Sequence, residues 1–256
     1  MPSIEDILRT FEPITLAQMD SVKLMDRTDT KYTFHISQLA EVLQLIHTDY
    51  RSLEIKERRI ANYKTLYYDT SALELYTKHH NGKLNRYKIR HRTYVDSGLG
   101  FLEVKFKNNK GRTIKDRIKE ITPLTHWDHN AAQFLDKKTP YTPADLVPTL
   151  WVNYSRITLV SRHTTERLTI DLNLEFVRND NSKQLHQLVI AEVKQEKAGE
   201  SKFIDAMKHL RIQEGSISKY CMAVAYTCDH AKKNGFKEKL LSIQKIIDYD
   251  VITDRR

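Results

Sequence analysis

Polar and apolar residues alternate along several separate stretches of the chain, a pattern typical of β-strands with one polar face. Between residues 84 and 119, charged residues occupy every second position in three successive runs. The runs are Arg86, Lys88, Arg90 and Arg92, then Glu103, Lys105 and Lys107, then Lys115, Arg117 and Lys119. Because alternate side chains of a strand point to opposite faces, the apolar residues between them lie on the other face. The pattern predicts a hairpin, turning at residues 95–100, with a third charged strand beside it.

The same alternation recurs on both sides of this unit. Polar faces are predicted for strands carrying Arg27, Asp29 and Lys31; Tyr154, Arg156 and Thr158; Arg167, Thr169 and Asp171; and Glu192, Lys194 and Glu196. Helical spacing of apolar residues occurs at 37–46, 71–80, 124–138, 201–210 and 236–247. We therefore predict one α+β domain over residues 1–256, with a helical lead-in of about residues 1–25 and a C-terminal helix at about 236–247.

Positive charges dominate the predicted polar faces, and like charges directly opposite each other destabilise a strand pair. A sheet that curls into a barrel places one face of every strand inside. The interior would then hold Lys31, Arg90, Arg92, Lys105, Arg156, Arg167 and Lys194 together with Glu103, Asp171 and Glu192. Charges in a medium of low dielectric constant are costly unless they are compensated. Such an interior requires water or an anionic ligand.

The composition favours a polyanionic partner without identifying it. The chain has 42 Lys and Arg against 33 Asp and Glu, a formal charge of +9. Nucleic acid, an acidic membrane surface and a phosphate-rich small molecule remain open at this point. Aromatic residues do not interleave with the basic ones as stacking platforms for single-stranded nucleic acid do, which makes nucleic acid the less favoured partner.

The sequence predicts a cytoplasmic protein that does not span a membrane. No window approaches the roughly 20 apolar residues that cross a bilayer, and the N-terminal residues do not resemble a signal peptide. Cys221 and Cys228 have no accompanying zinc-ligand spacing, so we expect reduced thiols.

A chain of phosphates would satisfy the basic residues, because each phosphate offers several acceptor oxygens and arginine can engage two of them at once. The fewer carboxylates suit Mg²⁺ or Mn²⁺, which take oxygen ligands from acids and from phosphates. Phosphoryl transfer relies mainly on positioning and on stabilising the charge of the moving group. The pattern therefore indicates a polyphosphate-like ligand.

Nine short segments together resemble the catalytic domain of the vacuolar transporter chaperone (VTC) family, a polyphosphate polymerase branch of the triphosphate tunnel metalloenzymes. They are DRTDTKY, LYYDT, RYKIRHR, FLEVKFK, RTIKDR, YSR, ERLTID, AEVK and SKY, in that order between about residues 25 and 225. The resemblance implies an eight-stranded antiparallel β-barrel tunnel flanked by helices. It also implies transfer of the ATP γ-phosphate to inorganic polyphosphate, with release of ADP and assistance from Mn²⁺ or Mg²⁺.

The resemblance also implies roles for individual residues. Phosphates would be held by Lys31, Arg90, Arg92, Lys105, Lys115, Arg156, Arg167 and Lys219. Cofactor binding falls to Lys88, Lys194 and Ser218, and the metal ligands are Glu192 and, more weakly, Glu103. Two positions depart from the family pattern: Arg27 stands where tunnel enzymes have a first acid before Asp29 and Lys31, and Ser216 stands where another lysine is expected.

Other interpretations stay open from the sequence. The chain could be a tripolyphosphate or nucleoside triphosphate hydrolase of the same fold, or a non-catalytic module that binds polyphosphate or RNA. Glu192 could simply pair with a neighbouring lysine, and Asp171 is expected to orient an arginine. We expect packing or surface roles for His79, His80 and His91, sheet packing for Tyr67 and Tyr68, and a plug or brace in the C-terminal helix. The sequence does not predict the oligomeric state.

Overall fold

The computed structural model describes residues 2–20, 28–196 and 199–249. The helices are α1 (Ile4–Arg9), α2 (Leu16–Asp20), η1 (Ile36–Gln38), α3 (Leu39–Ile46), α4 (Glu74–His80), α5 (His129–Lys138), η2 (Pro143–Asp145), α6 (Lys202–His209), α7 (Lys219–Thr227), η3 (Asn234–Phe236) and α8 (Lys237–Ile247). The strands are β1 (Glu12–Ile14), β2 (Thr28–His35), β3 (Tyr50–Leu53), β4 (Ile60–Asp69), β5 (Arg86–Tyr94), β6 (Leu99–Lys107), β7 (Thr113–Lys119), β8 (Val147–Ser161), β9 (Glu166–Arg178), β10 (Asn181–Leu185) and β11 (Leu188–Gln195).

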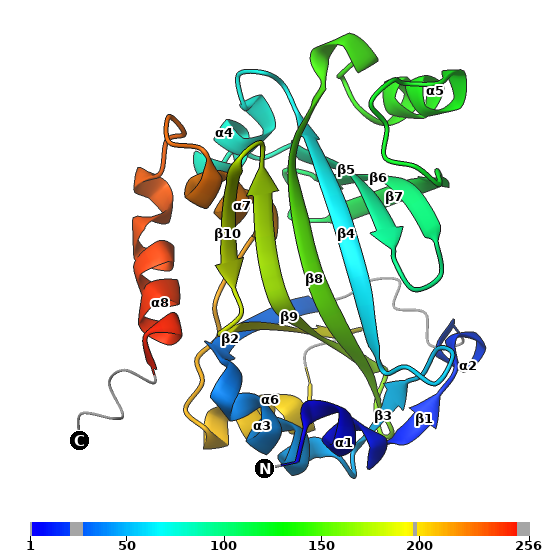
Figure 1. Ribbon diagram of the computed structural model, residues 1–256, viewed down its shortest axis with the longest axis vertical. Helices are drawn as coiled ribbons and strands as arrows, with labels where there is room; N and C mark the ends of the chain where they lie inside the picture. The colour runs from blue at the N-terminus through cyan, green and yellow to red at the C-terminus, as the bar shows by residue number, and fades with distance from the viewer. Residues whose placement is uncertain (1, 21–27, 197–198, 250–256) are drawn as a thin grey trace.

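Eight strands form the main path of the sheet, in the order β2-β11-β9-β8-β4-β5-β6-β7. Every pairing along this path is antiparallel. β10 pairs with β9 and β3 pairs with β8, both antiparallel, and β1 pairs with β3 in parallel. The α+β class and the predicted eight-stranded antiparallel sheet with flanking helices are confirmed (Figure 1).

The sheet curls strongly, but the pairings among the described residues do not join β2 to β7. The curl is visible in a single cavity that is lined both by β2 at one end of the path and by β6 and β7 at the other. Register shifts at Tyr67/Tyr68 in β4 and at Asn153/Ser155 in β8 accompany it. Such bulges increase the local twist of a sheet.

Helices cover the convex face of the sheet with two apolar clusters. α1, α3 and α6 pack on β2, β8, β9 and β11, where the helical spacing of Leu39, Val42, Leu43 and Ile46 buries one side of α3. α5 packs on β4, β5 and β6 through Ala131, Phe134 and Leu135. Figure 1 shows the first group at one end of the molecule and α5 at the other. These contacts leave the opposite, concave face to the charged residues.

Helix α7 fills part of the concave side. Its Tyr220, Cys221 and Val224 are buried together with Leu150 and Val152 of β8, in a cluster that also includes residues of β9 and β11. Residues of α8, including Ile243, pack against the same cluster. α7 is thus the plug of the curled sheet and α8 braces it, whereas the sequence pattern led us to expect a plug or brace from the C-terminal helix alone.

The N-terminal lead-in is less helical than expected. Glu12–Ile14 forms the short strand β1, which pairs with β3 and is not part of a helix. Ile14 is buried with Met19, Leu53 and Val160, and this small cluster fixes the lead-in to the main sheet. Within the described residues, none of the helices has the length and apolar character required to cross a bilayer.

Candidate functional site

Three lysines lie side by side across β5, β6 and β7, and we call them the lysine row: Lys88, Lys105 and Lys115. In the strand register, Lys88 lies directly opposite Lys105, and Lys105 lies directly opposite Lys115. Their side chains therefore share the concave face. Burial, and then the neighbouring cations, lower the pKa of Lys88 and of Lys105 to about 8. Burial likewise lowers the pKa of Lys115 to about 8, although Glu103 opposes the shift. Like charges in this register destabilise the empty sheet and favour an anion between them.

Glu103 of β6 links the lysine row to an arginine. Its carboxylate is fully buried. It accepts a hydrogen bond from Arg90 Nε at 2.7 Å and forms an ion pair with Lys115 Nζ at 2.6 Å. Arg90 also donates to the hydroxyl of Tyr67 at 3.2 Å. Burial alone would raise the pKa of Glu103, but the charges of Arg90, Arg92 and Lys115 outweigh it and hold the pKa below its usual range. Glu103 therefore fixes the direction of its two cations.

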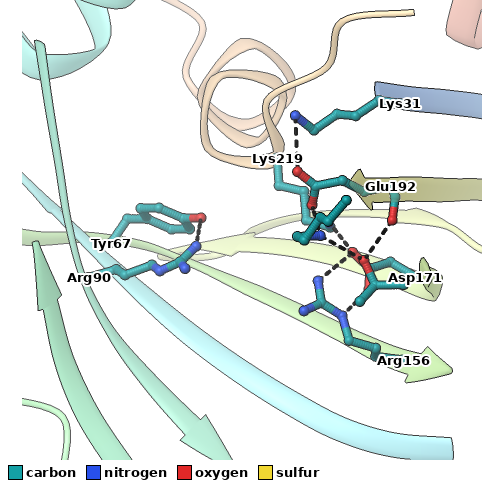
Figure 2. A network of polar contacts seen from close by, with 9 residues as sticks. Lys31, Tyr67, Arg90, Arg156, Asp171, Glu192 and Lys219 are labelled. Atoms are coloured by element: carbon teal, nitrogen blue, oxygen red, sulfur yellow. Dashed lines mark hydrogen bonds and ion pairs between the residues drawn. The ribbon is translucent and has the colours of Figure 1, made fainter. Parts of the chain in front are cut away.

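A second carboxylate, Asp171 of β9, holds two further cations (Figure 2). Arg156 Nε and Nη2 donate to the two oxygens of Asp171 at 2.6 and 2.9 Å, and Lys219 at the start of α7 donates to the same group. The guanidinium of Arg156 lies over the rings of Tyr63 and Tyr154, with distances to the centroids of 5.3 and 5.2 Å. The expectation that Asp171 orients an arginine is confirmed.

Glu192 of β11 is the third carboxylate of this kind. Its oxygens pair with Lys31 Nζ at 3.4 Å and with Lys194 Nζ at 2.9 Å, and Figure 2 shows Lys31 reaching it from the neighbouring strand. Burial would raise its pKa, but Lys194 and Lys31 lower it well below its usual range. Lys194 also donates to the hydroxyl of Thr169 at 3.3 Å. These contacts agree with the interpretation of Glu192 as a partner of neighbouring lysines.

The remaining predicted site residues have other contacts than these three carboxylates. Arg92 is buried with its guanidinium 5.7 Å from the ring centroid of Tyr63. Arg167 donates to the backbone carbonyl of Met19 at 3.3 Å, beside the N-terminal lead-in. Ser218 is the N-cap of α7, and its hydroxyl accepts a hydrogen bond from Lys88 Nζ at 2.9 Å. Arg27 lies outside the described residues.

A cavity of about 920 Å³ opens on the concave side between β5–β7 and the helices α7 and α8. Its lining brings together five predicted residues: Lys31, Lys88, Lys105, Lys115 and Ser218. Arg90, Arg156, Arg167, Lys194 and Lys219 do not line this cavity, although register and contacts place them on or against the same sheet face. Eight of the described lining residues are Lys or Arg, and Asp29 is the one acid among them. This imbalance makes the cavity strongly attractive to anions.

The donor set fits a divalent ion only in part. Among the described residues, no three His, Cys, Asp or Glu side chains gather into a metal-binding group. Glu103 is closed off by Arg90 and Lys115, whereas Glu192 is partly exposed, with a side chain 20% accessible. In the register of β2 and β11, Asp29 lies directly opposite Lys194, and Lys31 lies directly opposite Glu192. Asp29 is therefore on the same face as Glu192. An ion held by Glu192 would need phosphate oxygens for most of its ligands, and both ligand assignments stay predictions.

Sequence analysis missed several residues of the concave face. Tyr67 was expected only to pack the sheet, but its hydroxyl contacts Arg90. It has the same parity along β4 as Tyr63, and that alternation could have revealed it. Arg86, Lys107 and Lys239 line the cavity and were not among the predicted site residues. Nothing in the pattern of α8 indicates that Lys239 faces the cavity.

The fold and the site define a protein whose curled antiparallel sheet encloses a cavity lined by cations, with buried carboxylates holding the arginines and lysines in place. The profile of the VTC domain family matches residues 26–228, so the chain belongs to the VTC domain family. The match covers every strand of the main path and ends just after α7.

Solved structures with a related fold have little sequence in common with this chain. A candidate adenylate cyclase from Bacillus halodurans is 12% identical with a TM-score of 0.46, and the alignment covers 76% of this chain and 96% of that one. A candidate adenylyl cyclase from Hippeastrum, described as having a dominant triphosphatase activity, is 13% identical with a TM-score of 0.45, covering 78% and 96%. A comparison with curated protein sequences gives no match.

Proposed function

We propose that this chain is an ATP-dependent polyphosphate polymerase that transfers the γ-phosphate of ATP to the end of an inorganic polyphosphate. The observation that carries the proposal is the lysine row at the wall of a cavity with one acid among its described lining residues. Its three cations lie in direct register, with Lys88 and Lys105 half-buried and Lys115 more exposed. A linear chain of phosphates supplies the repeated negative charge that such a row requires. A single carboxylate or one phosphate would neutralise only part of it.

The fixed arginines and lysines would do the catalytic work. In the reaction, a terminal oxygen of the polyphosphate attacks the γ-phosphorus of ATP, the bond from that phosphorus to the bridging oxygen breaks, and ADP leaves with the electron pair. Arg90 is held by Glu103 and Arg156 by Asp171, so both guanidinium groups are oriented before substrate arrives. Preorganised donors of this kind stabilise the charge that develops during phosphoryl transfer. A divalent ion near Glu192 would add charge neutralisation between phosphate oxygens.

The state of the carboxylates favours transfer to phosphate over hydrolysis. A general base that activates water works best with a pKa near the operating pH. The pKa values of Glu103, Asp171 and Glu192 are all held below the usual range, because neighbouring cations outweigh the effect of burial. These groups are therefore weak bases. The terminal oxygen of a polyphosphate is already ionised and needs no base, which supports a phosphate acceptor.

The direct test is an activity assay with purified protein, ATP and Mn²⁺ or Mg²⁺. We expect ADP and acid-labile polyphosphate in matching amounts, and about a hundredfold lower rate in Lys105→Gln, comparable to the loss of one preorganised donor in other enzymes. Lys64→Gln is the matched control, because Lys64 is exposed on β4 on the opposite sheet face. Release of free phosphate without polymer would make the chain a hydrolase of tripolyphosphate or nucleotides.

A non-catalytic module that binds polyphosphate or RNA is the remaining alternative. No polymer and no nucleotide turnover with any divalent ion would favour it over an enzyme. If a Lys105→Ala, Arg156→Ala double variant then binds RNA as tightly as wild type, the nucleic-acid site lies outside the concave face.

A further inference from the structure

The start of α8 is fastened over the cavity by contacts with α4. The hydroxyl of Tyr76 donates to the carbonyl oxygen of Lys232 at 2.6 Å, and the amide of Gly235 donates to Nε2 of His80 at 2.9 Å. The ring of Phe236 packs against the rings of Tyr76, His79 and His80 at centroid distances of 6.0, 6.3 and 5.2 Å. Two hydrogen bonds and this ring packing fix the direction in which α8 leaves η3. The first turn of α8 is therefore positioned by the fold.

Lys239 in that first turn faces the cavity. Its Nζ donates to the hydroxyl of Ser216 at 2.7 Å, and both residues line the cavity. Ser216 lies two residues before Ser218, the N-cap of α7 that also receives Lys88. Lys239 thus brings a cation from outside the segment matched by the VTC profile to the end of the lysine row.

Two more cations line the cavity with Lys239, and neither forms an ion pair with an acid among the described residues. Arg86 of β5 is directly paired with Lys107 of β6, one alternate position outward from Lys88 and Lys105, and both line the cavity. Like charges in direct register are unfavourable. His79 lies close to these cations. Burial, followed by the charges of Lys88, Arg86, Lys239 and Lys107, lowers the pKa of His79 to about 2. Arg86, Lys107 and Lys239 therefore lie together at one part of the cavity wall.

We propose that Arg86, Lys107 and Lys239 form an outer phosphate subsite at the mouth of the cavity, completed by α8, which holds a phosphate group beyond those bound by the lysine row. This rests on the proposed function in taking the ligand to be a chain of phosphates. Two ligands share the chemistry: the outward end of a long polyphosphate, and the phosphates nearest the nucleoside of ATP. Tripolyphosphate, which the inner residues can hold alone, depends less on the outer subsite than either ligand.

The test is equilibrium binding of tripolyphosphate, long-chain polyphosphate and a non-hydrolysable ATP analogue to the full chain. In Lys239→Gln we expect about tenfold weaker binding of one or both longer ligands, the loss of one charge-assisted hydrogen bond, and a change of less than about twofold for tripolyphosphate. Lys237→Gln is the matched control, since it removes the same charge from an exposed residue of α8 that does not line the cavity. Adding Ser216→Lys to the Lys239→Gln variant should restore affinity, because that side chain begins where Lys239 ends.

The ligand that loses affinity identifies the occupant of the outer subsite. An effect confined to polyphosphate assigns it to the growing chain, and an effect on the ATP analogue assigns it to the donor. Equal behaviour of Lys239→Gln and Lys237→Gln, or an equal loss for all three ligands, would overturn the outer subsite. A melting temperature equal to that of wild type shows that a loss does not come from unfolding. Failure of wild-type protein to bind any phosphate chain would instead refute the proposed function itself.

Discussion

At the scale of single residues, the concave face is built from carboxylates that each hold two cations. Glu103 holds Arg90 and Lys115, and Asp171 holds Arg156 and Lys219. Breaking a buried pair by removing one partner costs about 3–5 kcal/mol, because the other charge stays buried and uncompensated. The carboxylates therefore keep the cations charged and oriented before the ligand arrives.

In the lysine row, Lys115 shares Glu103 with Arg90, and Lys88 and Lys105 form no ion pair with a described carboxylate. This partial compensation predicts a pH dependence. Lys88, Lys105 and Lys115 have pKa values of about 8 in the free protein, so they lose their charge as the pH rises through that value. An anion favours the charged form and raises these pKa values on binding. We expect tripolyphosphate affinity to fall steadily between about pH 7 and pH 9.5, and binding at about pH 8 to take up protons.

Calorimetry in buffers of different ionisation enthalpy measures both quantities. In Lys105→Arg the fall in affinity should be smaller, because arginine remains charged throughout this range. Affinity that does not change with pH, with no proton uptake, would show that the lysine row does not contact the ligand.

The charged residues of the site were accessible from the sequence because strand geometry has a fixed period. Alternation by two placed Arg90, Glu103 and Lys105 on one face, and the register confirms that they share it. The contacts of the carboxylates were less accessible. The sequence did not show that Glu103 and Glu192 each contact two cations, and their predicted role as metal ligands stays a prediction. Which cation reaches which carboxylate depends on the pairing register, which sets Arg90 opposite Glu103 and Lys31 opposite Glu192. The spacing within one strand does not encode that register.

At the scale of elements, α7 connects the apolar core to the site. Its buried Tyr220 donates to Asp69, which also accepts from the backbone amides of Leu75 and Tyr76 at the start of α4. Lys219 and Ser218, which reach the concave face, come immediately before Tyr220. The hydrogen bond to Asp69 therefore sets the position of the helix end that serves the site.

Removal of this hydroxyl should weaken both stability and binding. We expect Tyr220→Phe to lower the free energy of unfolding by about 2 kcal/mol, as for a hydrogen bond to a charged group, and to weaken tripolyphosphate binding because Lys219 and Ser218 shift with α7. Urea unfolding and equilibrium binding measure the two effects. Tyr226→Phe on the same helix is the control, since the hydroxyl of Tyr226 makes no hydrogen bond to a described residue. Equal unfolding energies for the two variants would contradict a positioning role for Tyr220.

The sequence predicted the strands better than the role of each helix. Strand alternation is a local signal, and the polar faces that it predicts fall on β2, β5, β6, β7, β8, β9 and β11 of the main path. The apolar residues of α7 indicate burial but not the side of the sheet on which the helix packs. That side is determined by the loop that leads from α6 into the concave space, where Gly215 donates to the carbonyl oxygen of Lys31 at 2.8 Å. The short strand β1 was missed because three residues are too few to show a period.

At the scale of the whole molecule, two sheet ends that are far apart in the strand order meet around one cavity. β2 contributes Asp29 and Lys31, and β6 and β7 contribute Lys105 and Lys115. No pairing among the described residues joins β2 to β7, so the two walls face each other across the cavity without a hydrogen-bonded seam. Lys105 is close enough to Glu192 and Asp29 for their charges to oppose part of the lowering of its pKa by burial. A chain of phosphates lying in this space would contact both walls.

The central claim is that the concave face, not the outer surface, binds the phosphates. A crystal structure of the full chain with tripolyphosphate tests it most directly. We predict phosphorus positions along the lysine row, with phosphate oxygens within hydrogen-bond distance of Lys105 Nζ and of the guanidinium group of Arg90. Tripolyphosphate bound only on the convex surface, with water alone beside Lys88, Lys105 and Lys115, would contradict the account.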